Sequence, residues 1–226
     1  MAIEAVLFDF SGTLFRLEPD DSWEDLVCVD GRTFDRVRQA EILARMTTPV
    51  GGSAEFDAVS RRTWERRDLD PALHRAAYAE VLRQSGLPTA HIERLYGRLI
   101  DPLAWTPYSD TGAVLKTLSA QNIPVAVVSN IAFDIRPAFA ANGWDRLTEY
   151  TLSFEIGAMK PDARIFQHAL DRLGVAAESA LMVGDSAEAD GGATALGCRF
   201  ALVDPLPTAD RPSGLLTALR DYGLSE

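Results

Sequence analysis

The sequence predicts an α/β protein in which a parallel sheet carries helices on both faces, with an α-helical domain inserted after the first strand. Short apolar runs that end in turns recur along the chain and are typical of buried strands. Helical patterns separate most of these runs, and such alternation favours a parallel sheet covered on both faces. One long stretch after the first run breaks this rhythm and has helical patterns only.

Apolar runs define the strands that we expect in the sheet. They are IEAVLF (3–8), PVAVVSN (124–130), YTLSF (150–154), ALMVGD (180–185) and FALVD (200–204). Capping residues, prolines and glycines place helices between them. These helices run from Ser109 or Asp110 to about Gln121, over roughly 133–142 with Gly143 as the end, and from about Pro161 to Gly174.

The stretch from 16 to 105 shows no convincing buried strand. Residues that favour helix starts precede helical patterns here, and Gly86 is a stop signal. These starts are Thr33, Ser53, Asp70 with Pro71, and Thr89; after Ser53, Phe56, Val59 and Thr63 recur at helical spacing beside Trp64. We therefore expect a core domain formed by residues 1–15 and 106–226 and an α-helical cap domain formed by residues 16–105.

Composition narrows the class of function. The formal net charge of −11 argues against general nucleic-acid binding and against an anionic membrane surface as a partner. Cys28 and Cys198 lie far apart and suggest neither a disulfide framework nor a thiolate metal site. The sequence shows no signal-peptide pattern and no apolar segment of membrane-spanning length, so we expect a cytoplasmic protein.

Polar residues follow the predicted strands at the edge where parallel strands end. They are Asp9 after the first run, Ser129 and Asn130 at the end of the second, Lys160 after the third, and Asp185 at the end of the fourth, with Asp190 close behind. Ligands of open α/β sheets bind at this edge. Each position alone is compatible with an ordinary turn, but their common order and placement predict one site.

Residue type suggests the chemistry of that site. A carboxylate such as Asp9 can attack phosphorus or an activated carbon and form a covalent intermediate. Asp9 and Asp185 offer the hard oxygen ligands that Mg²⁺ prefers. Lys160 and the Ser129 hydroxyl can bind phosphate oxygens, and the backbone amides around Phe10 and Gly12 could form an anion-binding nest.

Taken together, DFSGT, VVSN, KP and GDSAEAD resemble the four motifs of the haloacid dehalogenase superfamily of hydrolases. The resemblance implies a Rossmann-like core, a helical cap that closes over the site, and Mg²⁺ as cofactor. It makes Asp9 the nucleophile, with Thr13 and Gly12 supporting its loop, and assigns binding of the transferred group to Ser129, Asn130 and Lys160. It also makes Asp185 a Mg²⁺ ligand, lets the backbone carbonyl of Ser11 complete the protein ligands, and has Asp190 order Lys160 or a metal-bound water.

Ser11 departs from the pattern of the family's phosphatases, which usually have Asp two residues after the nucleophile to protonate the leaving group and activate water. A serine hydroxyl has no suitable pKa for that work. The resemblance therefore implies that metal binding survives while acid–base catalysis is impaired, unless a cap residue or the substrate supplies the acid.

Three functions are compatible with these residues. The first is a Mg²⁺-dependent phosphatase or phosphotransferase acting on a small phosphorylated metabolite. The second is a metal-free 2-haloacid dehalogenase with Asp9 as nucleophile, and the third is a catalytically impaired phosphate-binding regulatory protein. A phosphonate hydrolase would need a cap lysine, but the chain's only lysines are Lys116 and Lys160.

The cap sequence does not reveal the substrate. Arg62 and Arg66 lie one helical turn apart and could bind an anion, but a solvated helix face is the more ordinary interpretation. Structural or surface roles are expected for the histidines, and core packing for aromatic residues near the hinge. These residues are His74, His91, His168, Trp23, Trp105 and Tyr108.

Overall fold

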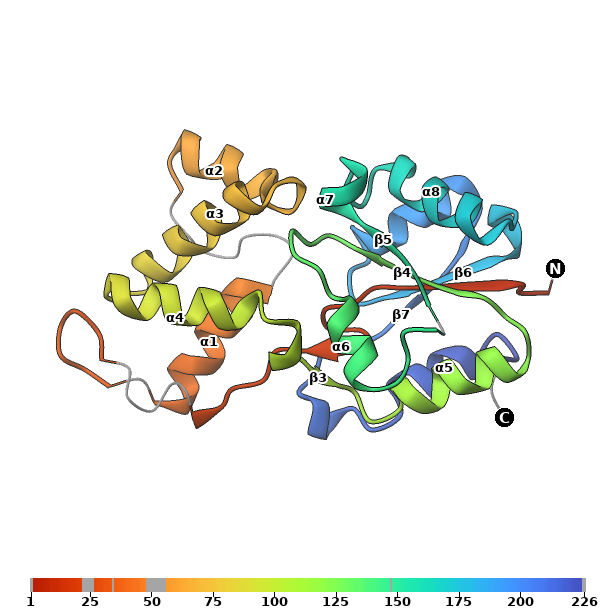
Figure 1. The fold of residues 1–226 in the computed structure, drawn as a ribbon, viewed down its shortest axis with the longest axis horizontal. Coiled ribbons are helices and arrows are strands. Elements are labelled where there is room, and N and C mark those ends of the chain that lie inside the picture. Colours follow the sequence, from red (N-terminus) through yellow and green to blue (C-terminus); the bar gives the residue numbers. More distant parts are fainter. Residues whose placement is uncertain (1, 22–26, 34, 48–55, 147, 225–226) are drawn as a thin grey trace.

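Five parallel strands form the central sheet of the computed structural model, which describes residues 2–21, 27–33, 35–47, 56–146 and 148–224 (Figure 1). The sheet order is β5–β4–β1–β6–β7. The strands are β1 (Ala5–Phe8), β4 (Val125–Ser129), β5 (Glu149–Leu152), β6 (Ala180–Gly184) and β7 (Arg199–Leu202). Each overlaps a predicted apolar run, so the predicted α/β class is confirmed.

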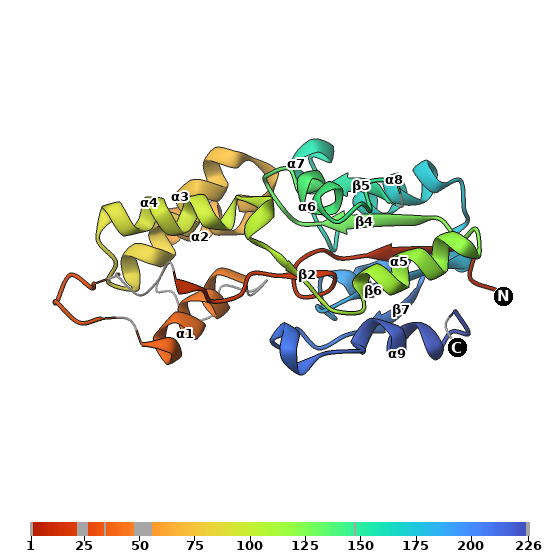
Figure 2. The ribbon, with the colours of Figure 1, turned by 60° about the horizontal axis from the view of Figure 1, so that its bottom comes forward.

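Alternate side chains of β1 enter two different cores because successive side chains of a strand point to opposite faces. Leu7 packs in one cluster with Phe166 of α8 (Ala163–Leu173), whereas Phe8 packs in the other with Leu118 of α5 (Thr111–Ala120) and with residues of α9 (Gly214–Arg220). Figure 2 shows α5 and α9 on one side of the sheet and α8 on the other. The sheet is therefore covered on both faces, as predicted.

The order of the strands places the end of β1 at a switch point of the sheet. The chain runs from β1 to β4 on one side and later returns to β6 on the other, and both neighbours pair with β1 in parallel. Crevices outside the carboxyl ends of strands form at such points. Asp9 directly follows β1 and donates its backbone N–H to the Val183 carbonyl of β6, so it lies in this crevice.

Helices α1 to α4 lie together beyond the carboxyl ends of the strands, away from the N- and C-termini (Figure 1). They are α1 (Arg36–Thr47), α2 (Ala58–Glu65), α3 (Pro71–Gln84) and α4 (Thr89–Leu99). Short 3₁₀ helices cover Arg67–Leu69 and Pro102–Ala104. The antiparallel pair β2 (Phe15–Arg16) and β3 (Thr106–Pro107) links this region, called here the helical region, to the sheet.

Side-chain caps explain where two of these helices begin. Asp70 accepts hydrogen bonds from the backbone N–H groups of Ala72 and Leu73, and Pro71 occupies the first turn of α3, as predicted. Asp57 caps α2 in the same way, through Val59 and Ser60. The predicted start at Ser53 and the aromatic Trp23 lie outside the described residues.

Several predicted boundaries in the helical region are wrong. Thr33 forms an isolated bridge with Val27 instead of capping α1, and Asp35 accepts from the Arg38 N–H at the start of that helix. Thr89 is itself the first residue of α4 and follows Pro88. The pair β2–β3 lacks any sequence signal because its strands are only two residues long.

Boundaries also differ in the α/β core. Ser153 and Phe154 begin α7 (Ser153–Ile156) instead of ending β5, and α6 (Arg136–Ala141) starts later than the predicted 133. The Asp110 side chain makes no bond at the start of α5 and instead accepts from the Leu215 N–H of α9. Among the described residues, no helix is long and apolar enough to cross a membrane.

Candidate active site

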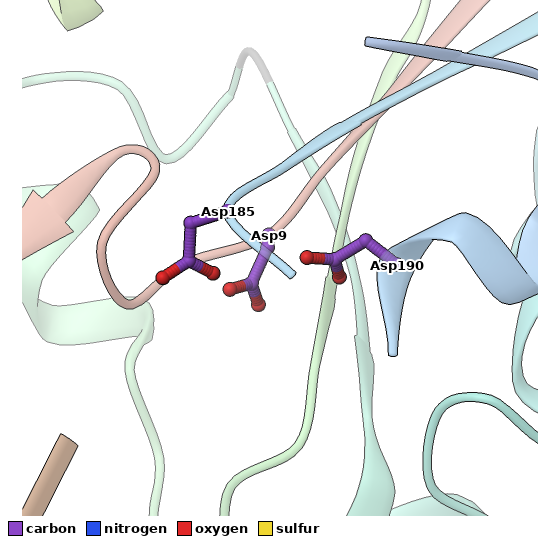
Figure 3. Close-up of side chains that lie close together, drawn as sticks. All are labelled: Asp9, Asp185 and Asp190. Atoms are coloured by element: carbon purple, nitrogen blue, oxygen red, sulfur yellow. The ribbon is translucent and has the colours of Figure 1, made fainter. Parts of the chain in front are cut away.

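Three aspartates converge at the carboxyl end of the sheet, where their carboxylates point toward one another (Figure 3). Asp9 follows β1, Asp185 follows β6, and Asp190 begins the 3₁₀ helix Asp190–Leu196. Ligand oxygens of the three side chains all lie within 4.8 Å of one another. The topology of a parallel sheet thus brings together carboxylates from opposite ends of the sequence, as the motif order predicted.

Lys160 lies between two of these carboxylates. Its Nζ is 2.7 Å from Asp9 Oδ1 and 2.6 Å from Asp190 Oδ1, and the residue is 4% exposed. The Asn130 side chain holds the backbone of Lys160 through two hydrogen bonds. Its Oδ1 accepts from the Lys160 N–H, and its Nδ2 donates to the Lys160 carbonyl. Asn130 therefore positions Lys160 in addition to lining the pocket.

The electrostatics of the cluster are dominated by burial. Burial raises the pKa of Asp9 to about 6, against the opposing charge of Lys160. Burial, reinforced by the charges of Asp9 and Asp190, raises the pKa of Asp185 to about 8. For Lys160, burial alone would lower the pKa, but Asp190 and Asp9 outweigh it and raise the pKa. Three carboxyl groups thus share one ammonium in a buried site.

Two glycines allow the close approach of these side chains. Gly12 has a φ of +76°, which favours glycine, and a Cβ there would lie 2.4 Å from Asp185 Oδ2. A Cβ on Gly184 would lie 2.2 Å from the Asp190 carboxyl carbon. Any side chain at either position would displace a carboxylate of the cluster.

Arg211, which the sequence did not reveal, holds the loop after Asp9. Its guanidinium donates 2.7 Å to the Gly12 carbonyl, and also to the Thr13 carbonyl, while lying 3.2 Å from the centre of the Tyr108 ring. The Thr13 hydroxyl is buried and has no hydrogen-bond partner among the described residues. The loop is thus held through its backbone carbonyls by an arginine far away in the sequence.

A pocket of about 170 Å³ opens over the cluster, between the sheet edge and the helical region. Its floor includes Asp9, Ser11, Ser129, Asn130 and Lys160, so the structure brings the predicted residues together. Several apolar and aromatic side chains form its walls: Met46, Leu99, Trp105, Ile131 and Phe133. The arrangement can hold a charged reacting group on the floor and a less polar part of a substrate above it.

The roof of the pocket contains polar residues that sequence reasoning missed. Arg67 and Asp68 are buried in the turn after α2, and His74 and Tyr78 reach in from α3. The predicted pair Arg62 and Arg66 is exposed instead. Arg67 directly follows the predicted pair in the sequence, but helix α2 ends at Glu65, so the chain turns there and Arg67 lines the pocket.

The roof groups contact one another. Arg67 Nη1 donates to the Trp64 carbonyl at 2.9 Å, and its Nη2 lies 3.4 Å from Asp68 Oδ2. His74 Nε2 lies 3.9 Å from Asp68 Oδ1, and its Nδ1 lies 3.0 Å from the Tyr96 hydroxyl. Burial, with the nearby Arg67 charge, lowers the pKa of His74 to about 3, so this histidine is neutral. It is structural as predicted, and it also lines the pocket.

The donor set fits a divalent cation. The residues that would hold it, Asp9 and Asp185, present hard carboxylate oxygens, and the Gly12 turn leaves space for a close approach. Three carboxyl groups lie here around one ammonium, and burial raises the pKa of both Asp9 and Asp185. A cation of the Mg²⁺ type would stabilise the ionised form of these carboxyl groups.

Comparison with known proteins agrees with the motifs. A family model for haloacid dehalogenase-like hydrolases matches residues 3–196. Haloacid dehalogenase-like hydrolase domain-containing protein 3 of Mus musculus is 31% identical over 164 residues, and the protein of the same name from Danio rerio is 37% identical over 94 residues. These matches cover 68% and 40% of this chain, and 61% and 38% of the mouse and zebrafish proteins.

One further relative and one solved structure match over most of their length. The ribulose-1,5-bisphosphate 5-phosphatase of Halopiger xanaduensis is 28% identical over 218 residues, which cover 91% of this chain and 87% of that protein. The structure of the L-2-haloacid dehalogenase from Xanthobacter autotrophicus superposes with a TM-score of 0.63 at 24% identity, covering 95% of this chain and 83% of that one. At that identity the structural match speaks for the fold alone.

Proposed function

This chain belongs to the haloacid dehalogenase-like hydrolases, and on that premise we propose that it is a Mg²⁺-dependent phosphatase or phosphotransferase that acts on a small phosphorylated metabolite through Asp9. The single observation that carries this proposal is the cluster of three carboxylates around one lysine at the pocket floor. Carboxylate oxygens beside a buried ammonium suit a site that works with a divalent cation and a phosphate. The relative named as a sugar bisphosphate phosphatase supports the same reaction class.

In the proposed reaction, the Asp9 carboxylate attacks the phosphorus and forms an aspartyl phosphate while the leaving oxygen departs. Lys160 and the Ser129 hydroxyl bind oxygens of the transferred group, and Asp190 holds the Lys160 ammonium in place through its 2.6 Å contact. Bound Mg²⁺ supplies the positive charge that allows a phosphate to approach the carboxylates. The helical region excludes water from the floor while the bond is made.

The proposal is tested by turnover of p-nitrophenyl phosphate with Mg²⁺ and with excess chelator. We expect turnover that requires Mg²⁺ and that falls by at least about a thousandfold in Asp9→Asn, because this variant keeps the shape of the side chain and removes the nucleophile. Full activity in chelator, or wild-type turnover in a folded Asp9→Asn variant, would contradict it.

The dehalogenase remains a second candidate because the pocket walls are apolar and aromatic, as a small haloacid would require, and because a halide leaving group needs no proton. Chelator-insensitive release of halide from a 2-haloacid would favour this reaction over the phosphatase. Binding of phosphate without turnover of either substrate class would favour the regulatory protein instead.

A further inference from the structure

The pocket contains a buried carboxyl group that the proposed reaction does not yet use. Asp68 is 3% exposed and lies in the roof, across the pocket from Asp9 and Lys160. Resting on the proposed function, we propose that Asp68 is the proton donor to the leaving group and the proton acceptor from the hydrolytic water. It would thus perform the acid–base work for which Ser11 is unsuited.

The backbone of Asp68 is fixed to the α/β core. The Ser153 hydroxyl donates to the Asp68 carbonyl at 2.5 Å and accepts the Ile131 N–H at 2.9 Å. Ser153 is itself fully buried at the end of β5. This contact holds the turn after α2 against the sheet edge, so Asp68 faces the floor at a defined place instead of moving with an exposed loop.

The contacts of the Asp68 carboxylate with its charged neighbours are long. Arg67 Nη2 lies 3.4 Å away and His74 Nε2 lies 3.9 Å away, which is longer than a good charge-assisted hydrogen bond. A buried carboxyl group held by such long contacts is costly for folding alone, and it is available to a ligand in the pocket.

The surroundings of Asp68 suit proton transfer near neutral pH. The ionisable groups that face it are Arg67, His74, Tyr78 and Lys160. Burial raises the pKa of Asp68 to about 6, against the opposing charges of Arg67 and Lys160. Tyr78 has its pKa raised to about 12 by burial, and His74 is neutral, so both are poorer donors.

The proton and the bonds balance over two steps. In the first, an oxygen of Asp9 bonds to phosphorus, the bond from phosphorus to the leaving oxygen breaks, and the Asp68 carboxyl proton moves to that oxygen. In the second, water attacks the aspartyl phosphate, its proton returns to the Asp68 carboxylate, and the bond to Asp9 breaks. Inorganic phosphate leaves and Asp68 is protonated again.

The test compares phenyl phosphate with p-nitrophenyl phosphate, which have similar shapes but leaving groups of different basicity. We expect Asp68→Asn to lower kcat/KM for phenyl phosphate on the order of 10²-fold and to change that for p-nitrophenyl phosphate much less. The parameter kcat/KM is used because it reports only the steps up to formation of the aspartyl phosphate, in which the leaving group departs. Equal losses on both substrates, or no loss on either, would overturn the proposal.

A second substitution should restore the activity lost in Asp68→Asn, which would not happen if Asp68 were merely structural. Ser11→Asp supplies a carboxyl group at the pocket floor. In the Asp68→Asn background it should restore phenyl phosphate turnover by about tenfold or more. Failure of that rescue in a folded double variant would count against Asp68 as the acid.

If Asp68→Asn does not fold, the pH dependence of the wild type tests the proposal instead. The ratio of kcat/KM for phenyl phosphate to that for p-nitrophenyl phosphate should fall as pH rises and Asp68 loses its proton, because groups common to both reactions cancel in the ratio. A flat ratio would overturn the assignment. A different result would contradict the proposed function itself: the wild type would show no Mg²⁺-dependent turnover of p-nitrophenyl phosphate.

Discussion

The Lys160 ammonium nitrogen lies 2.7 Å from a carboxylate oxygen of Asp9, and both residues are almost fully buried. Removing one partner of a buried ion pair leaves the other charge uncompensated, which typically costs about 3–5 kcal/mol. We therefore expect Lys160→Met to lower the free energy of unfolding in chelator by that amount and to abolish turnover. Lys116, the chain's other lysine, is exposed on α5, so Lys116→Met is the matched control. Urea unfolding would check both; equal stability of the two variants would contradict the prediction.

Mg²⁺ should stabilise the folded protein through Asp185. A ligand that binds only the folded state at about 100 times its dissociation constant adds about 2.7 kcal/mol. We expect Mg²⁺ to raise the melting temperature of the wild type, and Asp185→Asn to lose most of this rise. Asp171→Asn, an exposed carboxylate on α8, should keep it. An unchanged Mg²⁺ response in Asp185→Asn would place the cation elsewhere.

His74 should make the protein sensitive to mild acid. Its pKa is lowered by burial from 6.5 to about 3, so below pH 6.5 the unfolded chain binds a proton that the folded protein excludes. This contribution to stability is present above pH 6.5 and is lost as pH falls toward about 3. Between pH 7 and pH 5 the loss is about 2 kcal/mol.

The measurement is urea unfolding of the wild type and His74→Gln at both pH values. Asp68, whose pKa is raised to about 6, acts in the opposite direction in both proteins, so their difference isolates His74. An equal pH dependence in the two proteins would show that His74 is not held neutral.

Arg211 should affect the rate of the reaction without contacting the substrate. Arg211→Lys removes the pair of hydrogen bonds from the guanidinium to the Gly12 and Thr13 carbonyls and the stacking on Tyr108. A small displacement of the nucleophile can cost about 10²-fold, so we expect kcat to fall by tenfold to a hundredfold with little change in KM. Arg220→Lys, exposed on α9, is the control. A raised KM with unchanged kcat would contradict a positioning role.

The sequence was most informative where periodicity and topology decide the structure. Buried strands of a parallel sheet are continuous apolar runs, and their common edge predicts that Asp9, Lys160 and Asp185 lie close together. The strand pattern is misleading at the end of β5, where YTLSF continues it beyond the last residue of the strand. Ser153 there binds the Ile131 N–H and the Asp68 carbonyl, and these tertiary contacts turn the chain.

The roof of the pocket could not be predicted for a related reason. Arg67 and Asp68 look like members of a solvated charge run, and their burial depends on where α2 ends and how that turn meets the core. Arg211 lies in a loop without any pattern, and its role follows only from two backbone carbonyls near the other end of the sequence. Contacts between such distant segments leave no local signal.

The order of the strands in the sheet also governs how the molecule is assembled during synthesis. The ribosome makes β1 before either of its neighbours, and β4 and β6 follow only at residues 125 and 180. The helices from 36 to 99 are made in between and contact one another locally, so they can form while β1 still awaits its partners. Asp9 is therefore translated long before Arg211, and its loop is secured only after Arg211 has left the ribosome.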